Sequence, residues 1–436
     1  MRIQRVWGVI AAAVVVVACT GPAATTRPST APSVATSAAP TIYPGTPMPP
    51  VTAPPATDAP PTDAPPTEAP PSAGPSLPTS VGEGEGALSV LAWPGYAEDG
   101  TAYPDVDWIT PFEEETGCVT TVQGFGTSDE AFSLFTTNPE EFDVISASGD
   151  ASLRLVRAGF VQPVNTDLVP SYDEIYSSLK DQPYNTVDGV HWGIPHGRGS
   201  NQLMWRTDVI PDGQTRWDQE MFNPDTELNL SVYDAPIYIA DAAVELMDTQ
   251  PELGITNPYA LDDTQFAAAV ALLQGQAPNI TQYWTNYTDQ MDAFRNGDVD
   301  LGTTWQVIAN LLQAEDPPVP VELLKPEEGA TGWSDTWMIN SQTQRLNCAY
   351  KFVDYITSAE VNIQIAEWFG EAPGNSESCA LAVNPDHCEI FYADDETFWE
   401  NVWYWQTPEA QCVDGRTDVT CKDFDDWSTA WQELKG

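Results

Sequence analysis

The sequence predicts an α/β protein made of two lobes that are joined by a hinge. Strand-like and helix-like segments alternate along the chain from about residue 87 onwards. The stretch from 87 to 436 is too long for one small core, and it fits two lobes of ordinary domain size. The loops between these segments are dense in Trp, Tyr, Asp and Gly, and ligands of α/β sheets bind at such loops.

The first nineteen residues predict a lipoprotein signal peptide. Arg2 and Arg5 precede an apolar run that is too short to cross a bilayer comfortably, and Ala18 stands just before Cys19. In this pattern Cys19 is acylated and becomes the new N-terminus. A plain secretory peptide with an incidental Cys19, or an uncleaved anchor, remains the alternative. All three possibilities place the rest of the chain outside the cytoplasm. If the segment is a lipoprotein signal, the lipid on Cys19 is the chain's only contact with the membrane.

Residues 20–86 predict a disordered linker that is rich in Pro, Thr, Ala and Ser. A segment of this composition cannot bury enough apolar surface to offset the entropy of ordering it, and its prolines favour extended conformations. It is therefore interpreted as a spacer between a membrane surface and the globular part. A glycosylated stalk that crosses the cell wall is the alternative.

The first elements of the globular part follow in a strand, helix, strand, helix, strand order. Residues 87–92 and 118–122 predict strands, and 142–145 predicts a third. Between them, Thr110 and Thr127 each open a capping-box pattern, and Gly117 is placed to end the first helix. This is the rhythm of a sheet that is covered by helices on both faces.

Further elements are predicted downstream by the same hydrophobic spacing. Helices are expected at residues 240–247, 266–273, 291–296 and 359–368, with Gly370 ending the last, and strands at 301–305 and 319–323.

The chain is strongly acidic, with a formal net charge of −48. Such a field repels phosphates, which excludes nucleic acid as a partner. The charge has two interpretations: it concentrates cationic ligands, or it keeps the surface soluble at high salt. The solute must therefore be argued from particular residues.

With Cys19 assigned to the lipid, six cysteines remain, and an even number in a secreted chain predicts three disulfides. Fifteen pairings are formally possible. Cys379 with Cys388, and Cys412 with Cys421, would each close a short polar loop, which leaves Cys118 with Cys348. The histidines are scattered and no Cys-x-x-Cys pair occurs, so we expect neither a metal site nor a cofactor.

The sequence carries no signature of an enzyme. It has no nucleophile elbow, no His-Glu-x-x-His and no phosphate-binding glycine loop. Pairs of acids are common in so acidic a chain, so they discriminate little. A surface lipoprotein that binds or hydrolyses carbohydrate remains the alternative from another class, because aromatic platforms and acid pairs also suit sugars.

Several motifs occur in one order across the globular part. They are 91–96 (LAWPGY), 112–117 (FEEETG), 142–150 (FDVISASGD), 193–195 (GIP), 296–302 (NGDVDLG) before Trp305, 326–329 (PEEG) before Trp333, and 349–375 ending in EWFGEAPGN. In this order the chain resembles the spermidine/putrescine-binding proteins of ABC transporters, within the type II solute-binding proteins. The resemblance implies a periplasmic-binding-protein-like fold with a mixed sheet in each lobe. It also implies an extracytoplasmic monomer that captures a small cationic solute, a polyamine, and delivers it to the permease subunits of an importer.

The resemblance also implies a set of ligand-binding residues. They are Trp93, Tyr96, Ser148, Asp150, Asp234, Trp305, Trp333, Asp335 and Glu371. Carboxylates suit the ammonium ends of a polyamine, and aromatic faces suit its methylene stem and cation–π contact. Each residue also has a structural interpretation, because a Trp often packs in a core and an Asp often caps a helix.

Two departures from the family's pattern leave the choice of amine open. Ile237 stands where a second carboxylate is expected, and Glu371 stands where the family often has a tyrosine. His196 and Arg198 add a complication, since a cation near the cleft could pair with Glu371 or select a ligand that carries a carboxylate. Another amine or a zwitterion, or a receptor role without transport, remains an alternative.

The resemblance implies the boundaries of the lobes as well. Lobe 1 is expected to comprise 87–200 and 335–378, and lobe 2 to comprise 201–334 and 379–436. The chain then crosses between lobes near His196, near Trp333 and after about Cys379. Cys118 and Cys348 fall in the same lobe on this assignment, so their disulfide does not impede closure of the hinge.

Overall fold

The computed structural model describes residues 77–436. The predicted signal peptide with Cys19, and the predicted linker up to residue 76, lie outside the described residues. Within residues 77–436 no helix has the length and apolar character needed to cross a membrane.

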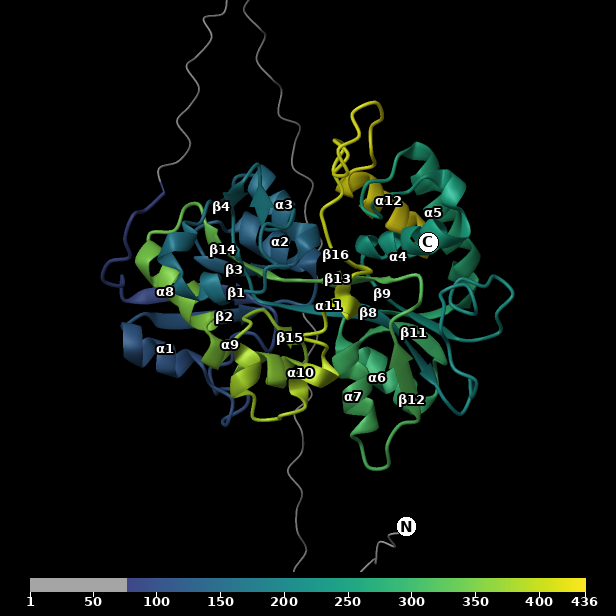
Figure 1. The fold of residues 1–436 in the computed structure, drawn as a ribbon, viewed down its shortest axis with the longest axis horizontal. Coiled ribbons are helices and arrows are strands. Elements are labelled where there is room, and N and C mark those ends of the chain that lie inside the picture. The colour runs from purple at the N-terminus through teal and green to yellow at the C-terminus, as the bar shows by residue number, and fades with distance from the viewer. Residues whose placement is uncertain (1–76) are drawn as a thin grey trace, which may run out of the picture. The chain divides into compact units, whose positions relative to one another are not determined.

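The first sheet has the strand order β2-β1-β3-β14-β4, with β7 paired to β14 (Figure 1). β1 runs parallel to β2 and β3, whereas β14 runs antiparallel to β3 and β4, so the sheet is mixed as predicted. Its strands are β1 (Ala87–Ala92), β2 (Val119–Gly124), β3 (Val144–Ala147), β4 (Val161–Gln162), β7 (Ile194–Pro195) and β14 (Thr336–Asn340).

Every residue of β3 and β14 is buried, which requires cover on both faces of the sheet. The helices that pack around it are α1 (Ile109–Thr116), α2 (Ser128–Thr137), α3 (Gly149–Arg157), α8 (Leu346–Ile356) and α9 (Ala359–Phe369). A small hairpin of β5 (Thr186–Val187) and β6 (Val190–His191) stands apart from this sheet.

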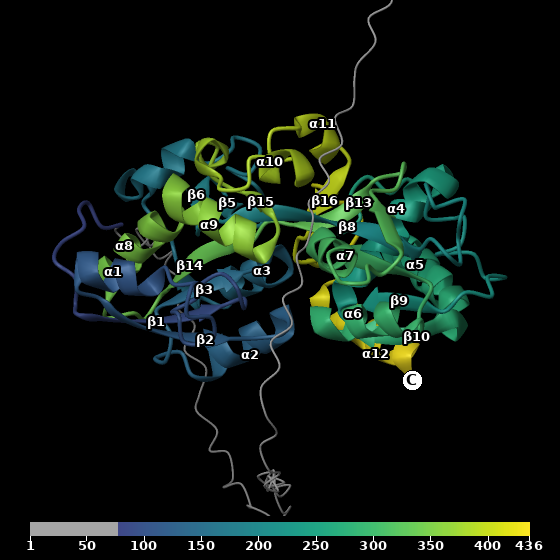
Figure 2. The same ribbon diagram turned by 90° about the horizontal axis from the view of Figure 1, so that it is seen from below.

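The second sheet has the order β10-β9-β11-β8-β13-β16, and β12 and β15 also pair with β8. Figure 2 labels β8, β9, β10, β13, β15 and β16 of this sheet. Its strands are β8 (Gly197–Arg206), β9 (Leu230–Tyr233), β10 (Ile280–Trp284), β11 (Leu301–Trp305), β12 (Val321–Leu324), β13 (Ala330–Trp333), β15 (Ala372–Pro373) and β16 (Val402–Tyr404). The helices of this part are α4 (Ile239–Thr249), α5 (Asp263–Gln276), α6 (Tyr287–Asn296), α7 (Gln306–Gln313) and α12 (Phe424–Lys435), with the short α10 (His387–Ile390) and α11 (Glu396–Trp399) nearby.

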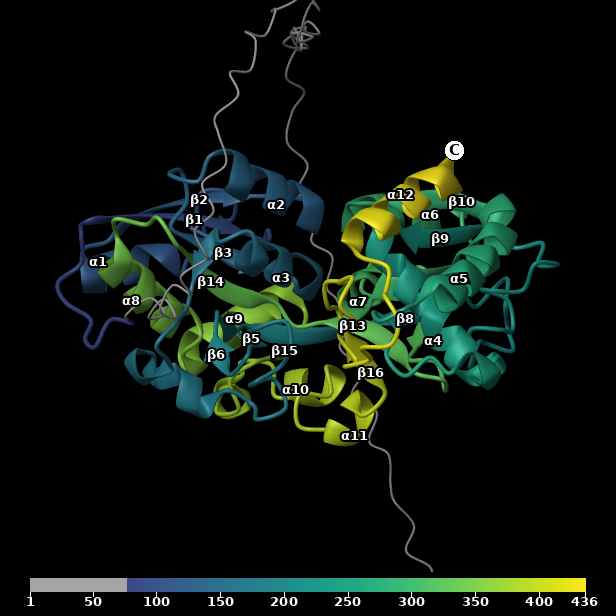
Figure 3. The same ribbon diagram turned by 90° about the horizontal axis from the view of Figure 1, so that it is seen from above.

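Strand β8 lies between the two groups of helices (Figure 3). Its first residues pair with β15 and β13, and its later residues pair with β11 and β12. Only Ser334 and Asp335 separate β13 in the second sheet from β14 in the first. The backbone N–H of His196 donates to the carbonyl of Asp335 at 2.8 Å, so two of the connecting segments are bonded to each other. The exact lobe boundaries stay a prediction.

Local sequence signals place most elements well, but the predicted cap of the first helix is wrong. β1 and β11 have the predicted bounds, and Gly117 and Gly370 end their helices with positive φ. Thr127 caps α2 as predicted. Thr110 does not cap α1, because the helix begins one residue earlier and the Asp107 carboxylate already accepts from the Thr110 N–H at 2.9 Å.

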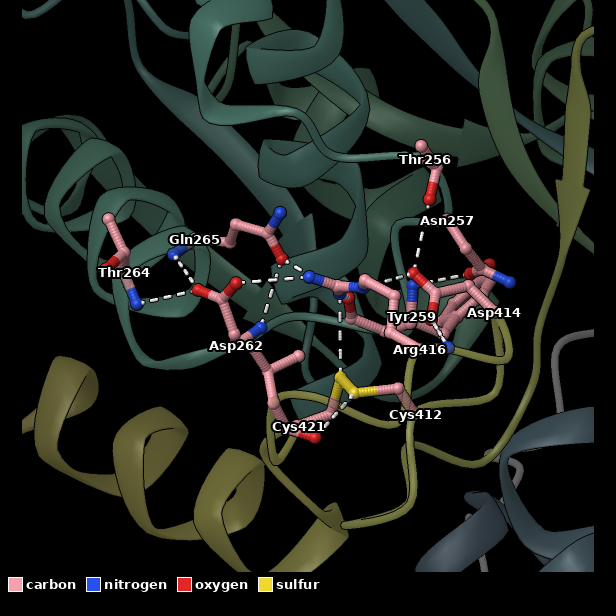
Figure 4. The surroundings of a disulfide bond; sticks show 12 residues. Thr256, Asn257, Tyr259, Asp262, Thr264, Gln265, Cys412, Asp414, Arg416 and Cys421 are labelled. Carbon is pink, nitrogen blue, oxygen red and sulfur yellow. Dashed lines mark hydrogen bonds and ion pairs between the residues drawn. A yellow bond between two sulfur atoms is a disulfide. The ribbon is translucent and has the colours of Figure 1, made fainter.

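The three predicted disulfides are formed. They join Cys118 to Cys348, Cys379 to Cys388 and Cys412 to Cys421. Beside the third, the Arg416 guanidinium donates to Asp414, Asp262 and Gln265, which fixes the disulfide loop to the start of α5 (Figure 4). The first disulfide joins the residue before β2 to α8, both of which pack on the first sheet.

The last residues of the predicted linker contact the first sheet's helices. Glu85 accepts from the backbone N–H groups of Asn347 and Cys348, at 2.9 and 2.8 Å, at the start of α8. Unpaired N–H groups at a helix start favour a carboxylate there. Burial acts to raise the pKa of Glu85, yet these hydrogen bonds hold it below its ordinary value. Gly84 lies flat on the Cys118–Cys348 disulfide, because a Cβ there would come within 2.6 Å of the Cys118 sulfur.

Candidate solute-binding site

A cavity lies where the two sheets meet, with about 250 Å³ of empty space that includes its opening to solvent. It is lined by Trp93, Ser148, Trp305, Trp333, Asp335, Phe369 and Trp405. Five of these were predicted from the sequence. Trp93, Trp305 and Trp333 lie at or just after the carboxyl ends of β1, β11 and β13, where α/β sheets place their ligands.

The walls of the cavity are aromatic and come from both sheets. The rings of Trp305 and Trp333 lie 5.4 Å apart, and Trp405 lies 6.3 Å from Trp333. On the opposite side, the Trp93 ring packs against Phe125 at 4.5 Å, and its indole N–H donates to the Ser148 hydroxyl at 3.1 Å. These contacts hold the ring faces in place around a small cavity with apolar walls.

Glycines on β8 make room for this wall. A Cβ at Gly199 would come within 2.1 Å of the Trp333 ring, and a Cβ at Gly197 within 2.5 Å of a Glu371 oxygen. Because side chains alternate along a strand, both glycines face the site and Arg198 faces away from it. The glycines therefore allow the close approach on which the site depends.

The acidic end of the cavity is a buried group of three residues. The Tyr96 hydroxyl lies 2.8 Å from Asp335 Oδ2 and 3.0 Å from Glu371 Oε2. Burial raises the pKa of Asp335 to about 6. Burial, and then the nearby Asp335, raise the pKa of Glu371 well above its ordinary value. Oδ1 of Asp335 has no hydrogen-bond partner within residues 77–436, so an incoming donor finds an acceptor there.

His196 adjoins this acidic end but carries no charge. Burial lowers the pKa of His196 to about 3, so its ring is neutral. The Trp337 indole N–H donates to its Nδ1 at 3.0 Å, which places the ring hydrogen on Nε2. That nitrogen lies 3.5 Å from Glu371 Oε1. His196 therefore faces Glu371 as a neutral donor.

Arg198 does not take the place that the sequence allowed for it. Its guanidinium donates to Glu396 at 2.9 Å and to the Ala393 carbonyl at 2.8 Å, and it lies over the Trp399 ring at 4.4 Å. The expectation that Arg198 could pair with Glu371 is wrong, because the alternation of β8 directs it to the other face of the strand.

Comparison with known proteins identifies the family. Residues 107–396 match the family of bacterial extracellular solute-binding proteins. The chain belongs to this family. The spermidine/putrescine-binding periplasmic protein of Escherichia coli K12 is 19% identical over 330 residues, which cover 73% of this chain and 90% of that protein. The putrescine/agmatine-binding protein of Pseudomonas aeruginosa is 20% identical over 291 residues, covering 63% and 78%.

Solved structures share the two-lobe fold of the type II class. The spermidine/putrescine ABC transporter substrate-binding protein PotD of Streptococcus pneumoniae superposes with a TM-score of 0.61 at 17% identity, covering 80% of this chain and 97% of that one. MotA of Agrobacterium tumefaciens B6, solved with glucopine, gives 0.60 at 16% identity, covering 80% and 100%. These neighbours, whose names give different ligands, share only their fold with this chain. The ligand of this chain therefore depends on the side chains that line its own cavity. The chain is a solute-binding protein of an ABC transporter, related to polyamine-binding proteins.

In this solute-binding protein, Asp150 lies near the cavity without lining it. The residue is buried in the first turn of α3, and its Oδ1 has no hydrogen-bond partner in the described part of the chain. Burial raises the pKa of Asp150 to about 7. Its backbone carbonyl accepts from the Thr407 hydroxyl at 2.9 Å, just beyond Trp405. An uncommitted carboxyl oxygen so placed can accept from a cation that enters between the sheets.

Asp234 is bound to the C-terminal helix. Its carboxylate accepts from the Trp431 indole N–H at 2.9 Å and from the Lys435 ammonium at 2.6 Å, both on α12. It is not among the residues that line the cavity. The sequence could not indicate this pairing, because Lys435 is 201 residues further along the chain.

Two residues that line the cavity were missed. Phe369 ends α9 and lies in the EWFGEAPGN motif, two residues before Glu371. Trp405 follows β16 in the aromatic run Trp403-Tyr404-Trp405. This density of aromatic residues was the available signal. Within residues 77–436, no group of three or more His, Cys, Asp or Glu side chains is arranged to hold a metal.

Proposed function

We propose that this solute-binding protein captures a polyamine of the putrescine or spermidine type between its two lobes and delivers it to the permease. The observation that carries the proposal is the free Oδ1 of buried Asp335 at one end of an aromatic cavity. A buried carboxyl without a partner is costly, and an ammonium group that donates to it relieves that cost. Two relatives named for binding putrescine support the same class of ligand.

The proposed roles follow from the position of each residue. Asp335 takes the ammonium end of the ligand, with Tyr96 and Glu371 beneath it. Trp93, Trp305 and Trp333 enclose the methylene stem, with Ser148 holding Trp93. Aromatic faces suit such a stem because they bury its apolar surface and attract the positive charge beside it.

The second ammonium group has two candidate partners in the proposed site. Asp150 has a free oxygen and stands two residues after Ser148, which lines the cavity. Asp234 can contribute only if the ligand displaces Lys435 from its carboxylate. We therefore assign the far ammonium to Asp150 first.

We also propose that the protein is held at the membrane by a lipid on Cys19, with the Pro-rich segment as its tether. The support is the basic, apolar and small-residue order that precedes Cys19. Mass spectrometry of the mature N-terminus tests this, and an N-terminus without lipid contradicts it.

The role of Asp335 is tested by Asp335→Asn. The substitution keeps the shape but removes the charge, so we expect putrescine and spermidine to bind about tenfold more weakly or worse, as for the loss of a charge-assisted hydrogen bond. Isothermal titration calorimetry measures this. Asp212→Asn, at an exposed position, is the matched control and should bind as the parent does.

A thermal-shift screen against amines, amino acids and oligosaccharides tests the ligand class as a whole. We expect amines to raise the unfolding temperature of the parent protein, because a ligand that binds only the folded state stabilises it. Stabilisation by oligosaccharides alone would overturn the proposal in favour of carbohydrate binding.

A further inference from the structure

The Tyr96 hydroxyl lies between two buried carboxyl groups, and it has a single hydrogen to donate. It is 2.8 Å from Asp335 Oδ2 and 3.0 Å from Glu371 Oε2, and both are hydrogen-bond distances. Two ionised carboxylates would both need that hydrogen. Both contacts are satisfied only when one carboxyl is a neutral acid that donates its own O–H to the tyrosine oxygen.

No cation within the described residues offsets two negative charges at this point. Glu371 is faced by Tyr96 from the turn after β1, by neutral His196 at the start of β8, by Trp333 of β13, and by Asp335. His387 of α10 bonds only to the Glu371 backbone carbonyl, at 2.9 Å, and Asp150 of α3 adds a further acid near Asp335. Arg198 is engaged with Glu396 on the other face of β8.

We infer that the ligand-free site holds one proton on the Asp335–Glu371 pair, that Glu371 carries it, and that a cationic headgroup expels it on binding. Glu371 is the better carrier because it lies deeper, whereas Asp335 lines the cavity. Like charges in a buried pair disfavour double ionisation. The inference rests on the proposed function, because it supposes that the ligand's headgroup is an ammonium.

The exchange balances in protons and in charge. An ammonium group that enters keeps all of its protons and forms a hydrogen bond to Asp335 Oδ1. Its positive charge then stabilises the second carboxylate, so the Glu371 proton leaves to bulk water. Once the proton has left Oε2, the other oxygen of the ionised Glu371, Oε1, faces the Nε2–H of His196, which makes His196 a positioning residue for the ionised state. Glu371 therefore links the affinity for amines to pH.

The first test counts protons by calorimetry of putrescine binding in two buffers that differ in ionisation enthalpy. At pH 8, Asp335 and Asp150, whose pKa values are raised by burial to about 6 and about 7, are already ionised, so we expect the parent protein to release close to one proton per putrescine bound and Glu371→Gln to release almost none. Glu360→Gln, at an exposed position on α9, the helix that ends two residues before Glu371, is the control and should match the parent. Putrescine binding without proton release in the parent would overturn the inference while leaving the proposed function intact.

The second test needs no ligand, so it separates this inference from the proposed function. The infrared difference spectrum of the parent minus Glu371→Gln should contain the C=O band of a neutral carboxylic acid, and that of the parent minus Glu360→Gln should not. If the band is missing from the first spectrum, or is lost in Asp335→Asn while Glu371→Gln keeps it, Glu371 is not the carrier. If no amine binds, the proposed function fails, and this spectrum still decides where the proton is.

Discussion

Gly199 determines the position of the Trp333 ring in the cavity. With a hydrogen in place of a side chain, the strand backbone and the ring approach more closely than any Cβ allows. Such a contact is invisible in the sequence, where Gly199 is one of several glycines in the Gly197-Arg198-Gly199 run. It shows how a residue with no functional group can determine the shape of a binding site.

We expect Gly199→Ala to weaken putrescine binding and to destabilise the fold. The new methyl group would lie about 2.1 Å from the ring, so Trp333 or β8 must move, and overpacking of this kind costs about 1–3 kcal/mol. Urea unfolding and calorimetric titration measure the two effects.

Gly275→Ala on α5 is the matched control for this substitution. Its nearest neighbour would be 3.9 Å from the new Cβ, and an alanine in a helix is favoured over glycine by about 0.5–1 kcal/mol. Unchanged putrescine affinity in Gly199→Ala would show that the close approach is not needed for the site.

The sequence indicated the separate residues of the site better than it indicated their partners. Trp93, Trp333 and Asp335 stand in recognisable motifs, and all three line the cavity. The contact of Tyr96 with Glu371 spans 275 residues, and no local pattern encodes a contact of that range. Hydrogen bonds between distant residues depend on how the two sheets are placed, which only the folded chain determines.

At the scale of elements, local patterns predicted β1, β2 and β3 of the first sheet but not β4, β7 and β14, and they missed α12 despite its clear signal. Phe424, Trp427 and Trp431 of α12 are buried at helical spacing, yet the acidic residues between them obscured the pattern. α3 was also missed, because it begins at Gly149, a residue that rarely opens a helix pattern. Boundaries that depend on caps shifted where a nearby Asp, such as Asp107, supplied the bond instead.

The disulfides should differ in their contribution to stability. Cys118–Cys348 closes a loop of 230 residues, whereas Cys412–Cys421 closes one of nine. In the chain-entropy description, removal of the disulfide that closes the long loop lowers the free energy of unfolding by up to about 5 kcal/mol. Removal of the disulfide that closes the short loop lowers it by up to about 3 kcal/mol. We expect the double substitution Cys118→Ala with Cys348→Ala to lower the free energy of unfolding more than Cys412→Ala with Cys421→Ala.

Urea unfolding of both double variants measures this difference. The contacts of the half-buried Arg416 around the short loop remain in its variant, which should limit the loss there (Figure 4). An equal or larger loss for the Cys412–Cys421 pair would contradict the expectation.

At the scale of the whole molecule, buried carboxyls make stability depend on pH. Burial raises the pKa of Asp335 to about 6, of Asp150 and Asp241 to about 7, and of Glu245 to about 8. A carboxyl with a raised folded-state pKa stabilises the fold fully below its unfolded pKa, near 4, and loses that contribution as the pH rises through the folded value.

We therefore expect the unfolding temperature to fall by several degrees between pH 5 and pH 8, because the folded chain binds more protons than the unfolded chain over this range. His196 acts in the opposite sense, since its pKa is lowered to about 3, but its effect grows only below about pH 6.5. Differential scanning calorimetry in buffers of equal ionic strength measures the trend. An unfolding temperature that rises towards pH 8 would contradict it.

Two controls separate this effect from the repulsion of surface charges, which the net charge of −48 makes strong. High salt screens exposed charges but hardly affects buried groups, so the trend should persist in salt. Asp241→Asn with Glu245→Gln, away from the cavity, should flatten it.

The contact of Glu85 with the start of α8 determines which part of the protein resists a force that pulls on the segment before β1. Any pull along the backbone at residue 82 reaches α8 through Asn347 and Cys348, and then the Cys118–Cys348 bridge beneath Gly84. The force is thus borne by the half of the molecule built on the first sheet. The half built on the second sheet makes none of these contacts, so we expect a movement of that half to leave the attachment of residues 82–85 to α8 unchanged.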